Sequence, residues 1–437
     1  MASNNRRGEV RELQNLLLQP KLEAKLSALR QIIAAMTVGK DVSMLFMDII
    51  KNMEVNNLEL KKLVYLYVIN YSKSQPDLAI LGINTFRKDA VDKSNPLIRA
   101  LAVRTMGSIR IKEVVEYLID TLKTAIKDED SYVRKTAVIC IAKMHDLSPN
   151  VLEEQGFLKL LENGLTDGNA MVVSNTVAAY QSISESKGYN MLQLSSYNVQ
   201  KLLTALNECN EWGQIYILDA LAQYVPSNAT EAENILERVA SRVSHSNAAV
   251  VISTVKIIMK YLDYLTNPDL IRSYAKKSAS PMISLLSHEP EIQFVVLKNI
   301  NIILQKRPNI LDKETKMFFC NFNDPIYIKL EKLESLVRLA DLKNIDAILH
   351  EFKDYATEID VEFVRKTVRA IGQCAVKLEK AADKCVQLLW ELLKGKVPFV
   401  VQEAVVVIRD IFRKYPGRYE QILKDICDHL KLLEEPE

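Results

Sequence analysis

The sequence contains little glycine and little proline. Its 437 residues include 12 glycines and 13 prolines, which is about 3% of each, against averages near 7% and 5%. Because glycine supplies tight turns and phosphate-binding loops, its scarcity argues against turn-rich β folds and nucleotide-binding α/β folds. Apolar residues make up 48% of the chain and charged residues 26%, a balance that excludes a mainly disordered protein.

A large excess of one charge and long hydrophobic runs are missing as well. The net charge is +2, so no strong field draws nucleic acid to the chain as a whole. The longest apolar run is the seven residues Leu63–Ile69, whereas a transmembrane helix needs about 20. The first eight residues contain no apolar signal core, so no secretory peptide is predicted. Six cysteines without a Cys-x-x-Cys spacing favour free thiols and a cytoplasmic protein.

Patterns that carry enzyme chemistry are also missing. No two of the five histidines lie within ten residues of each other, so the sequence offers no histidine pair for zinc. Gly39 and Lys40 lack the upstream Gly and the downstream Ser or Thr of a nucleotide-binding phosphate loop. We therefore predict no enzyme activity, no cofactor and no metal site. His145 follows a helical pattern, and we interpret it as a cation that complements a helix dipole.

What the sequence does contain is helical periodicity along nearly all of its length. In Leu60–Tyr71, apolar residues fall at positions 60, 63, 64, 67 and 68, which is the spacing of a buried helix face. Strand-like alternation is not evident. The pattern predicts an all-α protein.

One helix-start pattern also recurs at a nearly constant interval. It consists of a capping residue or a proline, then apolar residues, then a basic or polar residue. Its instances begin at Asn57, Asn95, Asp130, Asn169, Asn210, Asn247, Glu289, Asp324, Asp360 and Val397. The steps of 35 to 42 residues between them suit two helices and two turns, close to the interval of armadillo and HEAT repeats.

A helix pair of this size cannot bury its apolar face alone, but stacked pairs can. We therefore predict a right-handed α-solenoid of armadillo/HEAT-like repeats, in which residues 1–437 form one domain. The alternative is a set of unrelated helical domains that share ordinary capping chemistry.

Basic residues occupy early positions in several of the recurring helices. They are Lys61, Lys62, Arg99, Arg104, Arg134, Lys135, Arg365, Lys366 and Arg369. Equivalent positions in stacked repeats align, so these residues predict either a ridge that faces acidic protein, phosphate or anionic lipid, or a solvated face balanced by Asp and Glu.

Seven stretches resemble the N-terminal trunk of the beta subunits (beta-adaptins) of the clathrin-associated heterotetrameric adaptor complexes. They are Ala35–Ser43, Asn57–Tyr67, Ser72–Asp77, Asn95–Gly107, Lys201–Cys209, Asn323–Leu333 and Val401–Tyr415. They run from end to end of the chain and look most like the Golgi and plasma-membrane types.

The resemblance implies a scaffold that holds a medium and a small subunit beside a second large adaptin. Such a complex sorts transmembrane cargo into coated vesicles at the trans-Golgi network, endosomes or plasma membrane. We expect no hinge and no appendage within these residues, and clathrin binding only through parts absent from them. The competing interpretation is a transport receptor or phosphatase scaffold, which has the same architecture but different partners.

The resemblance also implies two sites and leads to one expectation about self-association. Plasma-membrane relatives bind phosphoinositides through a lysine-rich second helix, where this chain has only Lys21, Lys25 and Arg30. Golgi-type relatives bind an Arf-type GTPase at positions that match Ile80 and Ile83, with Leu78, Leu81 and Phe86 left for the core. Self-association through apolar residues around Ile422 and Leu430 is expected if the next repeat is missing.

Overall fold

The computed structural model describes residues 2–395 and 397–418, and all regular structure in these ranges is helical. The all-α repeat fold predicted from the sequence is confirmed. Contacts divide the chain into two compact units, residues 1–224 and 225–437. Ile422 and Leu430 lie outside the described residues. Within the described part, no helix is long and apolar enough to cross a bilayer.

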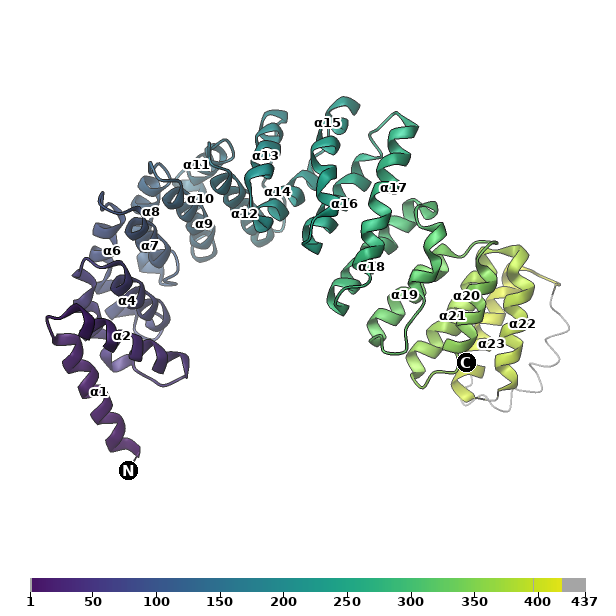
Figure 1. Cartoon of the computed structure of the whole chain (residues 1–437), viewed down its shortest axis with the longest axis horizontal. Helices are drawn as coiled ribbons and strands as arrows, with labels where there is room; N and C mark the ends of the chain where they lie inside the picture. Colours follow the sequence, from purple (N-terminus) through teal and green to yellow (C-terminus); the bar gives the residue numbers. More distant parts are fainter. Residues whose placement is uncertain (1, 396, 419–437) are drawn as a thin grey trace. The chain divides into compact units, whose positions relative to one another are not determined.

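The first unit is a series of helix pairs (Figure 1). Its α-helices are α1 Ala2–Leu18, α2 Leu22–Thr37, α3 Phe46–Ile50, α4 Leu58–Tyr71, α5 Pro76–Leu81, α6 Ile83–Ala90, α7 Pro96–Met106, α8 Lys112–Ala125, α9 Ser131–Leu147, α10 Val151–Glu154, α11 Phe157–Gly164, α12 Ala170–Lys187, α13 Ser196–Glu208 and α14 Glu211–Gln223. The 3-10 helices η1 Ser43–Leu45 and η2 Lys51–Glu54 flank α3. The second helices of the repeats, α4, α7, α9, α12 and α14, pack in that order.

The second unit repeats the arrangement. Its α-helices are α15 Ala229–Val239, α16 Ala248–Tyr261, α17 Pro268–Leu285, α18 Pro290–Lys306, α19 Ile326–Leu339, α20 Ile345–Tyr355, α21 Val361–Lys377, α22 Ala382–Lys394 and α23 Pro398–Lys414. Its 3-10 helices are η3 Ala240–Ser244, η4 Pro308–Ile310, η5 Asp312–Phe318 and η6 Glu379–Ala381. Helices α16, α18, α19, α21 and α23 form its row of second helices. Only η4 and η5 separate α18 from α19, so this repeat has no first α-helix.

Side-chain caps fix most of the predicted helix starts. A side-chain oxygen accepts a hydrogen bond from the first turn at Asn57, Asn95, Asp130, Asn169, Asn210, Asn247 and Asp360. Each such cap contributes about 1 kcal/mol. Glu289 and Val397 precede their helices without a side-chain cap. Asp324 lies one residue too early, because α19 starts at Ile326 after Pro325.

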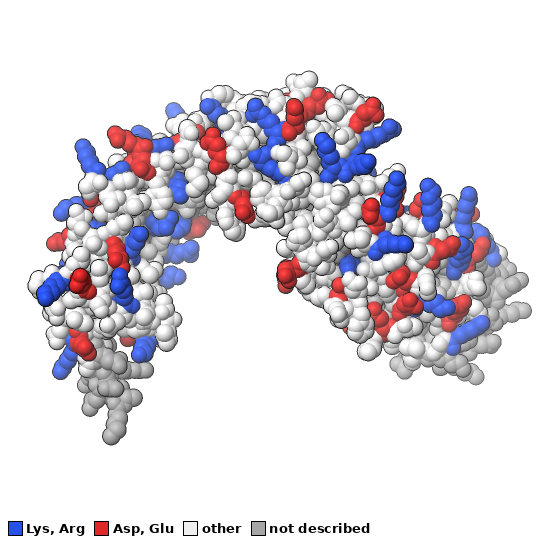
Figure 2. Space-filling model, in the orientation of Figure 1, with Lys and Arg blue, Asp and Glu red and all other residues white. Residues whose placement is uncertain are grey.

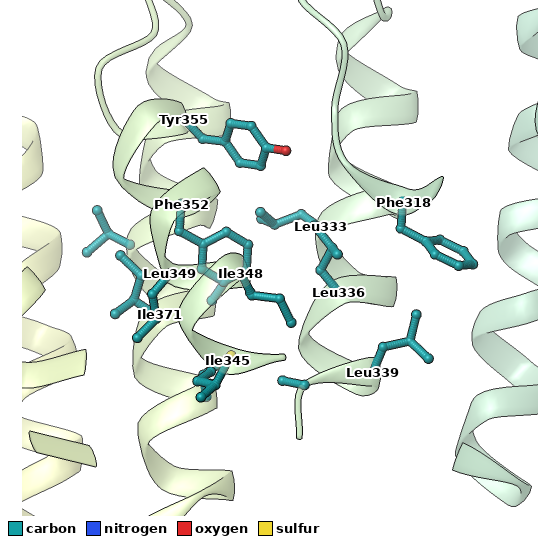
Figure 3. Packing of buried hydrophobic residues seen from close by; sticks show 14 of the residues in the cluster. Phe318, Leu333, Leu336, Leu339, Ile345, Ile348, Leu349, Phe352, Tyr355 and Ile371 are labelled. Carbon is teal, nitrogen blue, oxygen red and sulfur yellow. The ribbon is translucent and has the colours of Figure 1, made fainter. Parts of the chain in front are cut away.

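The cores are formed by the apolar stripes of successive helices. On α20, Ile345, Ile348 and Phe352 are almost fully buried, and Figure 3 shows them close to Leu333 and Leu336 of α19. Full burial of each such side chain contributes roughly 1.5–3 kcal/mol. Because each stripe packs on the neighbouring helices, the repeats depend on one another for stability.

Ion pairs join successive repeats. Arg99 of α7 forms a bidentate pair with Asp128, which lies in the turn after α8. Arg134 of α9 forms a bidentate pair with Asp167, which lies in the turn after α11. The Nε–Oδ2 distance is 2.8 Å in both pairs. The pairs Lys61–Asp89 and Arg369–Glu403 connect repeats in the same way. The side chains of Lys61, Arg99 and Arg134 are mostly buried in these pairs, so they form neither a free ridge nor a solvated face. Arg369 is 56% exposed and paired with a carboxylate, as the balanced, solvated face predicts. In the view of Figure 2, basic and acidic side chains are interspersed.

Candidate functional site

The residues predicted to bind a GTPase lie where α5 meets α6. Gly82 separates the two helices, but its backbone stays helical. Ala79, Ile83 and Phe86 form the buried stripe. The exposed fraction of the Ile83 side chain is only 2%.

The surface beside that stripe differs from the prediction. Ile80 is half-buried at its edge, whereas Leu81 is 57% exposed. The assignment of Leu81 to the core is therefore wrong, because this residue lies on the side of the helix opposite Ala79. The apolar side chains available to a partner here are the exposed Leu81 and the half-buried Leu78 and Ile80. GTPase binding through Ile80 and Ile83 stays a prediction.

The three cations of the predicted lipid site do not form one cluster. Lys21 is exposed just before α2, Lys25 is half-buried, and Arg30 is exposed. Lys25 and Arg30 are five residues apart, which places them about 140° from each other around the helix. The Arg30 guanidinium also lies 2.5 Å from the Glu59 carboxylate. Little uncompensated positive charge is therefore gathered at this position.

A larger exposed feature lies in the second unit, at the starts of α18, α19 and α21. We call it the apolar ridge. It consists of Val295, Phe322, Ile326, Tyr327, Ile359 and Val361. Phe322 is 84% exposed and Ile359 96% exposed, so both present nearly their whole side chains to the surroundings.

Contacts around the ridge hold these helix starts side by side. The rings of Phe294 and Tyr327 meet edge to face, with centroids 5.6 Å apart, and join α18 to α19. Lys329 Nζ lies 5.6 Å from the ring centroid of Phe322 and 5.3 Å from that of Phe363, and pairs with Glu358 at 2.6 Å. It thereby links the loop before α19 to the start of α21. Exposed apolar side chains held in this way make the ridge a candidate binding surface.

Sequence reasoning missed the ridge although the recurring helix-start pattern contains three of its members, Ile326, Tyr327 and Val361. Among them, Ile326 and Val361 are of the residue types that most often form a core. Only the packing shows that they lie on the open side of their helices, 44% exposed in each case. A usable signal was present at Ile359, where an isoleucine interrupts the polar loop before Asp360.

The described residues contain no group of three His, Cys, Asp or Glu side chains placed to hold a metal. Burial raises the pKa of the Cys140 thiol to about 11 and that of Cys374 to about 12, so both are poor nucleophiles at neutral pH. His145 lies in the last turn of α9, as predicted, but its interpretation as a cation is wrong. The side chain is 1% exposed, and burial, followed by the nearby Lys187, lowers its pKa.

Residues 5–437 match the family model described as the adaptin N terminal region. The chain is 56% identical over 432 residues to the AP-1 complex subunit beta of Dictyostelium discoideum, covering 99% of this chain and 46% of the relative. It is 55% identical over 437 residues to the human AP-1 complex subunit beta-1, covering 100% and 46%.

More distant relatives extend the comparison. The AP-2 complex subunit beta of Schizosaccharomyces pombe is 42% identical over 414 residues, covering 94% of this chain and 61% of the relative. A chain in a homology model of the full-length AP-3 complex has the same fold, with a TM-score of 0.68 at 20% identity, over 97% of this chain and 73% of that one. The chain thus spans about half the length of the first of these relatives, and the resemblance drawn from the sequence is confirmed.

Proposed function

Since the chain belongs to the adaptin N-terminal region family, we propose that it is the N-terminal part of the beta subunit of a clathrin adaptor complex. In this role it is a non-enzymatic scaffold in a complex that sorts transmembrane cargo into coated vesicles. The observation that carries the proposal is the identity of 55% over all 437 residues to a protein named as a complex subunit. A solenoid suits this role because its long surface offers several separate binding sites.

The apolar ridge supports the part of the proposal that concerns partners. A medium, a small and a second large subunit each need a stable contact, and stable interfaces have an apolar, aromatic-rich centre. Phe322, Tyr327 and Ile359 supply such a centre on the described surface. We propose that one of these subunits binds the apolar ridge.

Co-expression tests this assignment. The 437-residue chain is produced with the other three adaptor subunits, and the product is separated by size-exclusion chromatography. One peak with all four chains is expected. Phe322→Ser with Ile359→Ser should weaken assembly, whereas Tyr197→Ser, at an exposed tyrosine of the first unit, should not. A double variant that assembles as well as the unmodified chain refutes the assignment of the ridge.

Binding of an Arf-type GTPase at the junction of α5 and α6 remains part of the proposal, with Ile80 and Ile83 as the predicted contacts. Because Ile83 is buried, its replacement by Asp would test folding rather than binding. Ile80→Asp with Leu81→Asp is the better variant. It should abolish GTP-dependent binding while the helical circular dichroism stays unchanged. Retained binding would refute this site.

Membrane contact through Lys21, Lys25 and Arg30 is proposed to be weak. Each basic residue near an anionic surface contributes about 1 kcal/mol, and Arg30 is already paired with Glu59. Binding to phosphoinositide vesicles should therefore be slight and should fall with salt, and tight binding would refute this. The proposed location is on coated vesicles of the trans-Golgi network, endosomes or plasma membrane.

A further inference from the structure

The second unit has a groove at the repeat that has no first α-helix. Between α18 and α19 the chain passes only through η4 and η5. In the next repeat, α20 fills the corresponding place and buries Ile345, Ile348 and Phe352. Without such a helix, one side of α17 is left partly uncovered.

The uncovered side of α17 is a stripe of small and apolar residues. Ile271, Ala275, Ala279 and Ile283 recur at intervals of four and are all half-buried. Together with Ile310 of η4 they line a groove of about 960 Å³. This volume lies at the upper end of the range of ligand sites, roughly 300–1,000 Å³. The alanines leave room for a second helix to approach α17 closely.

The rim of the groove is mainly basic. The groove is lined by the cations Arg272, Lys276, Lys306, Arg307 and Lys313 and by only two carboxylates, those of Asp312 and Glu314.

Some of these cations already have partners. Arg307 pairs with Asp263 at 2.6 Å, and Lys306 lies 3.9 Å from the same carboxylate. The contact of Arg272 with Asp269 is long, at 3.8 Å, and highly exposed, so it neutralises little. Lys276 and Lys313 have no ion pair among the described residues.

We propose that this groove binds an amphipathic helix of a partner protein, with acidic residues on both sides of its apolar stripe. The bound helix takes the place of the missing first helix of the repeat. Its apolar side chains pack on Ala275, Ala279 and Ile283, and its carboxylates face Lys276 and Lys313. A helix in an apolar groove is a common mode of peptide recognition, and the basic rim selects acidic partners.

A fluorescent helical peptide of about 15 residues, with leucines at the spacing i, i+3, i+4, i+7 and glutamates on both flanks, is the probe. Its binding to the 437-residue chain is followed by fluorescence anisotropy, beside a peptide in which every glutamate is replaced by lysine. Saturable binding of the acidic peptide is expected, at least about tenfold tighter than that of the basic one and weaker at high salt. Equal binding of the two peptides overturns the proposal.

Two matched pairs of variants locate the binding. Lys276→Glu with Lys313→Glu should weaken binding about tenfold, whereas Lys343→Glu with Lys366→Glu, at exposed positions outside the groove, should not. Ala279→Phe fills the groove without a change of charge and should also weaken binding, whereas Ser273→Phe on the exposed side of α17 should not. Each variant is accepted only if its thermal unfolding matches that of the unmodified chain.

Anionic membranes are the other class of acidic partner. Vesicles that contain phosphatidylserine are therefore tested with the same variants. Because a bilayer is too flat to enter the groove, Ala279→Phe should leave vesicle binding unchanged. The proposal is overturned if the acidic peptide does not bind but vesicles do, and if vesicle binding is weakened by Lys276→Glu with Lys313→Glu and left unchanged by Ala279→Phe.

Discussion

The pair between Arg134 and Asp167 should be one of the strongest single links between two repeats. Asp167 accepts hydrogen bonds from Nε and Nη2 of Arg134 at 2.8 and 3.0 Å, and from the backbone N–H of Asn169 at 2.8 Å. Both side chains are mostly buried, with 20% and 15% exposed. Asp167→Asn therefore removes the charge while it keeps a side chain of the same shape.

The expected cost follows from this geometry. Breaking a fully buried pair costs about 3–5 kcal/mol, and exposed pairs are worth about 0–1. The remaining exposure places Asp167→Asn between these limits, at roughly 2–3 kcal/mol. For a unit of this size, each 1 kcal/mol lowers Tm by about 2–4 °C, so Tm should fall by roughly 4–12 °C.

The pH dependence supplies a second test. Burial alone would raise the pKa of Asp167, but hydrogen bonds from Arg134 and from Asn169 outweigh it and lower that pKa below its ordinary value. The folded protein therefore binds this proton less readily than the unfolded chain does. The stabilisation is present above the unfolded pKa of about 3.9 and is lost as pH falls through the lower folded value. Asp167→Asn should therefore lack this pH-dependent stabilisation.

Thermal unfolding followed by circular dichroism measures both effects. Arg134→Met completes a double-mutant cycle. Glu59→Gln is the matched control, because its exposed pair with Arg30 should change stability by no more than about 0.5 kcal/mol. A coupling between Arg134 and Asp167 no larger than that of the control pair would show that this link does not hold the repeats together.

Further outcomes are expected at other positions. Gly372→Ala should destabilise the protein by about 1–3 kcal/mol, because the added Cβ would lie 2.2 Å from Val407 Cγ1; unchanged thermal unfolding would contradict that packing. His145 is buried with a lowered pKa, so below pH about 6.5 the unfolded chain gains a proton more readily and stability should fall. His145→Leu should reduce this fall when thermal unfolding is compared between pH 7 and 5. Ile83→Asp should unfold its region, whereas Leu81→Asp should leave the circular dichroism unchanged, and the reverse result would contradict the burial of this helix.

The repeat fold was predictable because its signals are local. Caps such as Asn95 and Asp130 recur at readable intervals and act within one turn of their own helix. The partners of Arg99 and Arg134 were not predictable, since each lies 29 or 33 residues away and only stacking brings them together. The groove beside α17 was missed for a similar reason. A missing helix appears in the sequence only as an ordinary loop.

The predicted site shows the limit of periodicity. The three-residue spacing of Ile80 and Ile83 correctly indicates nearby positions on a helix, but it does not state which side faces the core. Packing buries Ile83 and exposes Leu81. The apolar ridge depends on the same kind of information, because Ile326 and Val361 resemble core residues until their helices are placed beside one another.

Affinity capture tests the central claim most directly. The tagged 437-residue chain is incubated with cytosol, and the bound proteins are quantified by mass spectrometry. If the chain is an adaptor scaffold, then a medium, a small and a second large adaptor subunit should be recovered in near-equal amounts. Recovery of nuclear transport cargo or a phosphatase in their place would contradict the account.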